Sequence, residues 1–81
     1  MRVAVATISL NEEANIKPWL ASTEGADYVL IADTGSTDNT AIIAIHERAN
    51  VINVRVKPWR FDLARNAALA AIPDWIDWVI W

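Results

Sequence analysis

The chain has 81 residues, which allow one domain at most, and 54% of them are hydrophobic, including five Trp. Its formal net charge of −3 at pH 7 argues against a nucleic-acid binder that works through a basic surface. The absence of cysteine excludes disulfides and thiolate metal sites and fits a cytoplasmic location, and no apolar run reaches the ~18 residues of a transmembrane segment.

The first half of the chain predicts two strand–helix units. Residues 3–10 form a largely apolar strand, as expected for a strand that is buried on both faces. A helix follows to about residue 22, with Asn15 as its N-cap and Pro18 in its first turn, where proline is tolerated. A second strand covers residues 27–32, and a second helix runs from residue 37 or 38 to residue 49.

The second half adds a third unit and the start of a fourth. Residues 51–56 are rich in β-branched side chains and predict a strand, and a loop over residues 57–61 leads to a helix over 63–72 that Asp62 caps. Residues 77–81 begin a fourth strand. The order βαβαβαβ predicts an α/β fold, a Rossmann-like parallel sheet in a three-layer sandwich. Because no turn or polar tail closes the last strand, we expect the front part of a longer protein, which associates through this unfinished edge strand.

Three polar loops should meet at the carboxyl edge of this sheet, where parallel sheets bind their ligands. They are residues 11–13, 33–38 and 57–65. Together they supply carboxylates, an amide, hydroxyls and basic groups, and the second loop adds the free N–H groups of a helix N-terminus. Carboxylates accept from a base or a ribose, and arginine matches phosphate oxygens in pairs. The set predicts a crevice for a nucleotide.

Most of these residues also have a structural interpretation. The alternative role is a helix cap for Ser36, Thr37 and Asp38, a helix-dipole contact for Glu12 and Glu13, and an ion pair with Asp62 for Arg65. Asp33 is the hardest to explain in this way, because a carboxylate at the end of a buried strand is costly unless something uses it. Trp59 and Phe61, which lie beside the basic residues, are candidates for a pocket wall.

Three segments resemble the family-two glycosyltransferases, in the order and at the spacing of that family. They are the first strand with Asn11-Glu12-Glu13, residues 31–40 with Asp33-Thr34-Gly35-Ser36, and residues 59–66 with Trp59, Arg65 and Asn66. The resemblance covers essentially the whole chain and implies an A-type nucleotide-sugar transferase (GT-A) fold, truncated after the start of the fourth strand. Residues 1–81 would then be the incomplete N-terminal part of the domain, which binds the nucleotide sugar.

The resemblance implies transfer of a sugar from a nucleoside-diphosphate sugar to an acceptor hydroxyl, with the acceptor (glycan, lipid or protein) undefined. The residues that it assigns to the nucleotide sugar are Asn11, Glu12, Asp33, Thr34, Ser36 and Arg65. A divalent metal, Mg or Mn, is expected in the full-length enzyme, with its ligands and the catalytic base downstream of this chain. The chain alone is therefore expected to be inactive. Many family members have two adjacent acids where this chain has Asp33-Thr34.

Two other functions compete with this interpretation. One is a non-catalytic truncated fragment. The other is a retroviral-type aspartic protease, since Asp33-Thr34-Gly35 after an apolar strand matches the catalytic loop of those enzymes. That protease fold is all-β and uses many glycines, whereas this chain has two glycines and a predicted helix after the loop. Helix content therefore separates the protease from the transferase.

Overall fold

The structure is a computed structural model that describes residues 1–57 and 59–81. Its strands are β1 (Val3–Ser9), β2 (Tyr28–Asp33), β3 (Asn50–Asn53) and β4 (Trp78–Ile80), and its helices are α1 (Glu13–Ser22), α2 (Thr40–His46) and α3 (Phe61–Ala70). Strands and helices alternate in the predicted order. Pro58, which belongs to the loop predicted over residues 57–61, lies outside the described residues.

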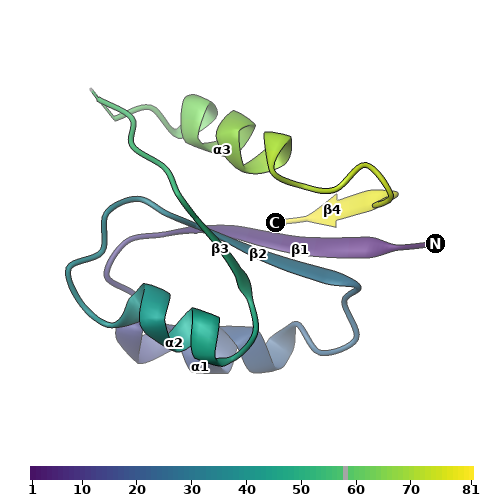
Figure 1. Cartoon of the computed structure of the whole chain (residues 1–81), viewed down its shortest axis with the longest axis horizontal. Coiled ribbons are helices and arrows are strands. Elements are labelled where there is room, and N and C mark those ends of the chain that lie inside the picture. The colour runs from purple at the N-terminus through teal and green to yellow at the C-terminus, as the bar shows by residue number, and fades with distance from the viewer. Residues whose placement is uncertain (58) are drawn as a thin grey trace.

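The four strands form one parallel sheet in the order β3-β2-β1-β4. Helices α1 and α2 cover one face of this sheet and α3 covers the other, so that the molecule has three layers (Figure 1). This arrangement confirms the predicted α/β, Rossmann-like class. Its three helices also exclude the all-β fold of a retroviral-type protease.

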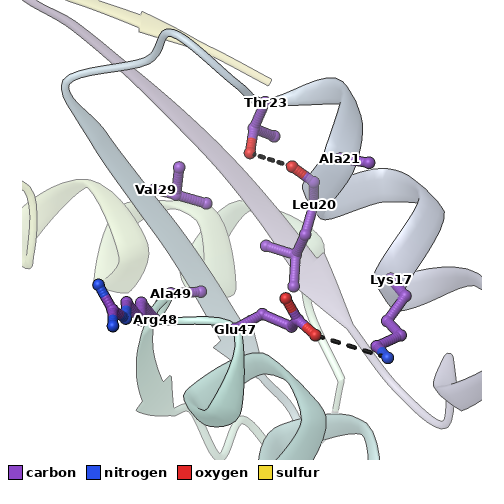
Figure 2. A pocket seen from close by; sticks show the side chains of 8 residues that line it. All are labelled: Lys17, Leu20, Ala21, Thr23, Val29, Glu47, Arg48 and Ala49. Carbon is purple, nitrogen blue, oxygen red and sulfur yellow. Dashed lines mark hydrogen bonds and ion pairs between the residues drawn. The ribbon is translucent and has the colours of Figure 1, made fainter.

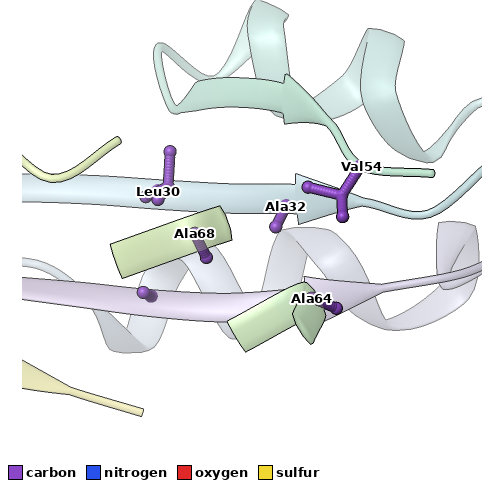
Figure 3. Packing of buried hydrophobic residues seen from close by; sticks show 6 residues of the cluster. Leu30, Ala32, Val54, Ala64 and Ala68 are labelled. Carbon is purple, nitrogen blue, oxygen red and sulfur yellow. The ribbon is translucent and has the colours of Figure 1, made fainter. Parts of the chain in front are cut away.

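Each face of the sheet has its own apolar cluster. Under α3, the small side chains of Ala64 and Ala68 let the helix approach Leu30 and Ala32 of β2 closely, and Val54 closes the cluster (Figure 3). On the other face, α1 and α2 pack on Ile31 and on their own buried side chains. Successive residues of a strand point to opposite faces, so β2 contributes to both clusters. The sheet is thereby fixed between its helices, and the carboxyl ends of its strands face one common edge.

Helix α1 begins earlier than the sequence pattern predicts. Its N-cap is Glu12, not Asn15, and the Asn15 amide group instead donates to the Glu12 carboxylate at 3.0 Å. Pro18 consequently lies inside the helix and not in its first turn. The predicted N-cap was wrong because the amides of Glu12 and Glu13 are bonded to Thr40 and Asp38, as described below, so that the helix begins at Glu13.

The other predicted boundaries shift as well. Helix α2 begins only at Thr40 and ends at His46, before Arg48, whose φ of 68° lies in the left-handed region. Asp62 does not cap α3, since it lies within the first turn and pairs with Arg60 at 2.8 Å. Strand β3 ends at Asn53 instead of residue 56, and β4 is three residues long.

Candidate functional site

The loops after β1 and β2 start side by side at the carboxyl edge of the sheet. The register pairs the last residue of β1, Ser9, with the last residue of β2, Asp33. In Figure 1 both loops, and the segment that leads from β3 to α3, lie at the same end of the molecule. The three polar segments therefore lie at one edge of the sheet, as predicted.

Asp33 is buried, with 3% of its surface exposed. Its carboxylate accepts hydrogen bonds from the turn that follows it and from the adjacent strand. One carboxylate oxygen accepts from the hydroxyls of Ser9 and Ser36, and the other accepts from the backbone amides of Gly35 and Ser36 at 3.3 and 3.0 Å. Burial raises the pKa of Asp33, but the hydrogen bonds from Ser36, Ser9 and Gly35 outweigh it and leave the pKa below its ordinary value. Asp33 thus holds the turn after β2 as an ionised, fully bonded carboxylate.

The backbone amides of the first loop donate to side chains of the second. The amides of residues 11–13 donate in turn to Ser36 Oγ, Thr40 Oγ1 and Asp38 Oδ2, at 2.9, 2.9 and 3.2 Å. Thr40 is completely buried, and its hydroxyl also donates to Asp38. The amides at the start of α1, those of Glu12 and Glu13, are thus bonded to side chains at the start of α2.

The bonds also run in the reverse direction. The amides of Thr37 and Asp38 donate to Asn11 Oδ1 at 2.8 and 3.4 Å, and the amide of Asn39 donates to Glu13 Oε1 at 3.1 Å. We call these six hydrogen bonds the cross-loop network. Three consecutive amides of each loop are satisfied by side chains of the other, so the amides that the sequence analysis regarded as free for a ligand are already bonded.

Asp38 accepts hydrogen bonds from the first residues of both α1 and α2. This is a structural role at a helix start, the alternative to ligand binding for this residue. Besides the amide of Glu13, it accepts from the amide of Thr40 at 2.9 Å, in the first turn of α2. The hydrogen bond from the Thr40 hydroxyl, with those from the two amides, outweighs desolvation and lowers the pKa of Asp38. Ser36 does not cap α2, because its hydroxyl lies between the Asn11 amide and Asp33.

A pocket of about 490 Å³ opens beside the cross-loop network. This volume lies within the range of small-molecule sites. Its lining residues come from the end of β1, from both loops and from the start of α3: Ile8, Ser9, Leu10, Glu12, Thr34, Trp59 and Phe61. The pocket therefore has an apolar wall with a carboxylate at one side, and its two aromatic side chains remain about half exposed.

Of the six predicted site residues, Glu12 and Thr34 line this pocket and the others do not. Thr34 also ties the loop to β1, because its amide and its hydroxyl both donate to the carbonyl oxygen of Ser9, at 2.9 Å each. Arg65 is separate from the group. Its guanidinium lies 5.0 Å from the ring centroid of Trp81, and Asp62 pairs with Arg60 and not with Arg65. The aromatic wall anticipated from Trp59 and Phe61 is present.

Sequence reasoning missed Ser9 and Thr40. Ser9 is a polar residue at the end of an apolar strand, in register with Asp33, and that placement is a signal that could have been used. Thr40 had no such signal, because its importance comes from the amide of Glu12, 28 residues earlier in the chain.

A second hollow, of about 330 Å³, lies between the carboxyl ends of α1 and α2 (Figure 2). Leu20, Val29 and Ala49 form part of its wall, and an ion pair between Lys17 and Glu47 at 3.6 Å crosses its rim. It contains none of the predicted site residues and lies away from the carboxyl edge of the sheet. Of the two hollows, only the first is lined by predicted site residues.

Over residues 1–57 and 59–81, no three His, Asp or Glu side chains are grouped so that they could hold a metal ion. Within the same part of the chain, none of the helices has the length and apolar character that a bilayer crossing requires.

No family model matches the chain, and neither does any curated protein. Crystal structures of glucosyl-3-phosphoglycerate synthase from Mycobacterium tuberculosis do match it. The complex with Mn²⁺, UDP-glucose and glycerol 3-phosphate has a TM-score of 0.75 and 32% identity, over 89% of this chain and 30% of that chain. The complex with Mn²⁺, UDP and glucosyl-3-phosphoglycerate has a TM-score of 0.73 and 31% identity over the same shares.

The matched structures are much longer than this chain, which spans about 30% of their length. At 31–32% identity, this chain resembles the matched structures in sequence as well as in fold. Complexes with a nucleotide sugar contain the synthase together with Mn²⁺ and UDP-glucose.

Proposed function

The chain has the GT-A fold of the family-two glycosyltransferases and resembles them in sequence, and on that premise we propose that it is the part of such an enzyme that holds a nucleoside-diphosphate sugar. The observation that carries the proposal is the position of the pocket. It lies at the carboxyl edge of a parallel sheet, where α/β proteins bind nucleotides, and it combines a carboxylate with an aromatic wall.

The lining of the pocket suits a nucleoside. The Glu12 carboxylate can accept hydrogen bonds from ribose hydroxyls or from a base N–H, and Trp59 and Phe61 offer apolar faces against which a base can pack. Glu12 is the acidic one of the predicted site residues that line the pocket, and one of its carboxylate oxygens accepts from the Asn15 side-chain amide. We therefore assign the direct contact to Glu12, with Thr34 beside it.

Other residues that the sequence assigned to the nucleotide sugar have different roles in the proposal. Asp33 and Ser36 shape the turn that carries Thr34, since their polar atoms bond to one another. Arg65 stays a candidate for the phosphates, although in this structure it lies over Trp81.

Sugar transfer is a property that we propose for the whole enzyme. The synthase structures contain Mn²⁺, and a divalent metal is part of the proposal for the full-length protein. The carboxylates of the described residues do not fit a metal site, because Asp33 and Asp38 are bonded to hydroxyls and amides and no third ligand joins them. A cytoplasmic location rests on the lack of cysteine.

The proposal is tested by titrating the chain with UDP and with UDP-glucose, each in the presence of Mn²⁺, while amide signals are followed by NMR. We expect shifts at the amides of Glu12 and Thr34. Glu12→Gln removes the charge at constant size and should weaken binding about tenfold or more, roughly 1.4 kcal/mol, without changing the thermal midpoint.

The matched control is Glu24→Gln, which changes an exposed carboxylate in the turn after α1. Its affinity should equal that of the wild type. The proposal is wrong if the wild type binds neither compound, and the assignment of Glu12 is wrong if both variants bind equally well. In the first case a non-catalytic, non-binding fragment is the better description.

A further inference from the structure

The cross-loop network depends most on one side chain, that of Asn11. Its Oδ1 atom accepts from two consecutive amides, those of Thr37 and Asp38, while its own amide donates to Ser36. Both amides belong to the turn that precedes α2, so a side chain 26 and 27 residues away in the sequence fixes the approach to this helix.

The backbone of Asn11 is adapted to this task. Its φ of 51° lies in the left-handed region, which asparagine tolerates better than most residues. The bond from its amide continues through the Ser36 hydroxyl to the buried carboxylate of Asp33. Asn11 therefore connects the surface of the first loop to the buried end of β2.

Asn11 does not line the pocket, yet its neighbours do. Leu10 and Glu12, on either side of it, form one wall, and Thr34 belongs to the loop that Asn11 binds. A bond between the two loops sets the distance between these walls. The acceptor oxygen of Asn11 is already used by two amides, so only its side-chain NH2 group is left to contact a ligand.

We infer that Asn11 is a positioning residue, which holds Glu12 and Thr34 at the spacing that the nucleotide needs and does not contact the nucleotide itself. This inference rests on the proposed function, because it takes the pocket to be the nucleotide site. It replaces the direct contact that the sequence resemblance assigned to Asn11.

Two substitutions separate positioning from contact. Asn11→Asp keeps an acceptor oxygen for the amides of Thr37 and Asp38, but it replaces the donor group with a negative charge. Asn11→Gly keeps the left-handed backbone free of strain and removes the acceptor. A positioning residue tolerates the first change and not the second, whereas a residue that donates to an anionic nucleotide loses binding in both.

The experiment measures amide hydrogen exchange and UDP affinity, with Mn²⁺ present, in the wild type and both variants. We expect Asn11→Gly to exchange faster at Thr37 and Asp38 by about tenfold or more and to bind UDP about tenfold more weakly. Asn11→Asp should stay within about threefold of the wild type in both measurements. The control is Asp27→Ala, which removes the acceptor of the Val3 amide (2.7 Å) at the opposite edge of the sheet and should leave UDP affinity unchanged.

Each outcome decides a separate point. Equal loss of UDP affinity in Asn11→Asp and Asn11→Gly would show a direct contact and overturn the inference. Unchanged exchange in Asn11→Gly overturns it too, because the loops would then be held without Asn11. A wild-type chain that binds no UDP overturns the proposed function and the nucleotide part of the inference, while the exchange rates still decide whether Asn11 joins the loops.

Discussion

The loops at the carboxyl edge of the sheet and the segment from α3 to β4 are stabilised in opposite ways. In the loops, residues 9–13 and 33–40, amides, hydroxyls and carboxylates bond to one another across the two chain segments. The later segment, residues 61–81, has few polar bonds of this kind and is held by the contact of small apolar side chains with the sheet. There Trp78 and Ile80 are 61% and 55% exposed.

The difference shows where each region is sensitive. A network of polar bonds in a partly buried place loses much free energy when one partner is removed, because the other partner is left without water or a bond. An apolar side chain that is already exposed loses little when it is replaced. The buried polar groups of the loops, Asp33 and Thr40, should therefore respond strongly to single-atom changes, and the outer face of β4 should not.

The largest effect is expected for Asp33→Ala. The change leaves the hydroxyls of Ser9 and Ser36 and two turn amides without their acceptor, so the free energy of unfolding should fall by about 3 kcal/mol in urea titrations followed by circular dichroism. UDP affinity should fall with it, about tenfold or more. A loss of less than about 1 kcal/mol would remove the contrast between the two regions.

Thr40→Val should have the next largest effect. Valine keeps the shape of the buried side chain but removes the acceptor of the Glu12 amide and the donor to Asp38, at an expected cost of about 1–2 kcal/mol. Thr37→Val is the matched control at an exposed position of the same loop and should cost less than about 0.5 kcal/mol. Equal losses in the two variants would contradict a specific role for the Thr40 hydroxyl.

Acid should weaken the loops before it affects the later segment. The pKa values of Asp33 and Asp38 are lowered in the folded chain, so both carboxylates contribute stability above their unfolded pKa of about 3.9, and this contribution is lost as the pH falls through the folded values. We expect the urea midpoint to be flat from about pH 7 to pH 5 and to fall below about pH 4. Asp38→Asn should make that fall shallower, and an unchanged slope would contradict the assignment.

The smallest effect on stability is expected for Trp78→Thr, on the exposed face of β4. The free energy of unfolding should change by less than about 0.5 kcal/mol, while self-association in sedimentation experiments should decrease if the edge strand mediates it. Val79→Ala, on the face toward α3, should cost more, about 1 kcal/mol, because Val79 packs against the core. Equal losses of stability in the two variants would mean that both faces of β4 contribute equally to the free energy of unfolding.

The alternation of strands and helices and the meeting of the loops could be predicted because they depend on patterns that are local in the sequence. Apolar runs separated by helical segments specify a parallel sheet, and a parallel sheet brings its carboxyl-end loops together. The pocket wall of Trp59 and Phe61 follows from the same geometry. For these features the sequence pattern and the three-dimensional structure carry the same information.

The helix starts could not be predicted in this way. Local rules look for a cap next to the helix, and they selected Asn15 for α1 and residue 37 or 38 as the start of α2. In the structure the amide of Glu12, the N-cap of α1, bonds to Thr40, and the amides of Thr37 and Asp38 bond to Asn11; both partners are distant in the sequence. Arg65 was placed by resemblance alone, and its contact with Trp81 depends on how α3 packs beside β4.

The pairing of Ser9 with Asp33 has a consequence for how the chain folds. The bonds of the cross-loop network join residues that are 25 to 28 positions apart, and none of them can form until β1 and β2 lie in their final register. A slip of one residue would turn the paired side chains to opposite faces of the sheet. The pocket beside these loops is therefore completed only after the first two strands have found their correct alignment.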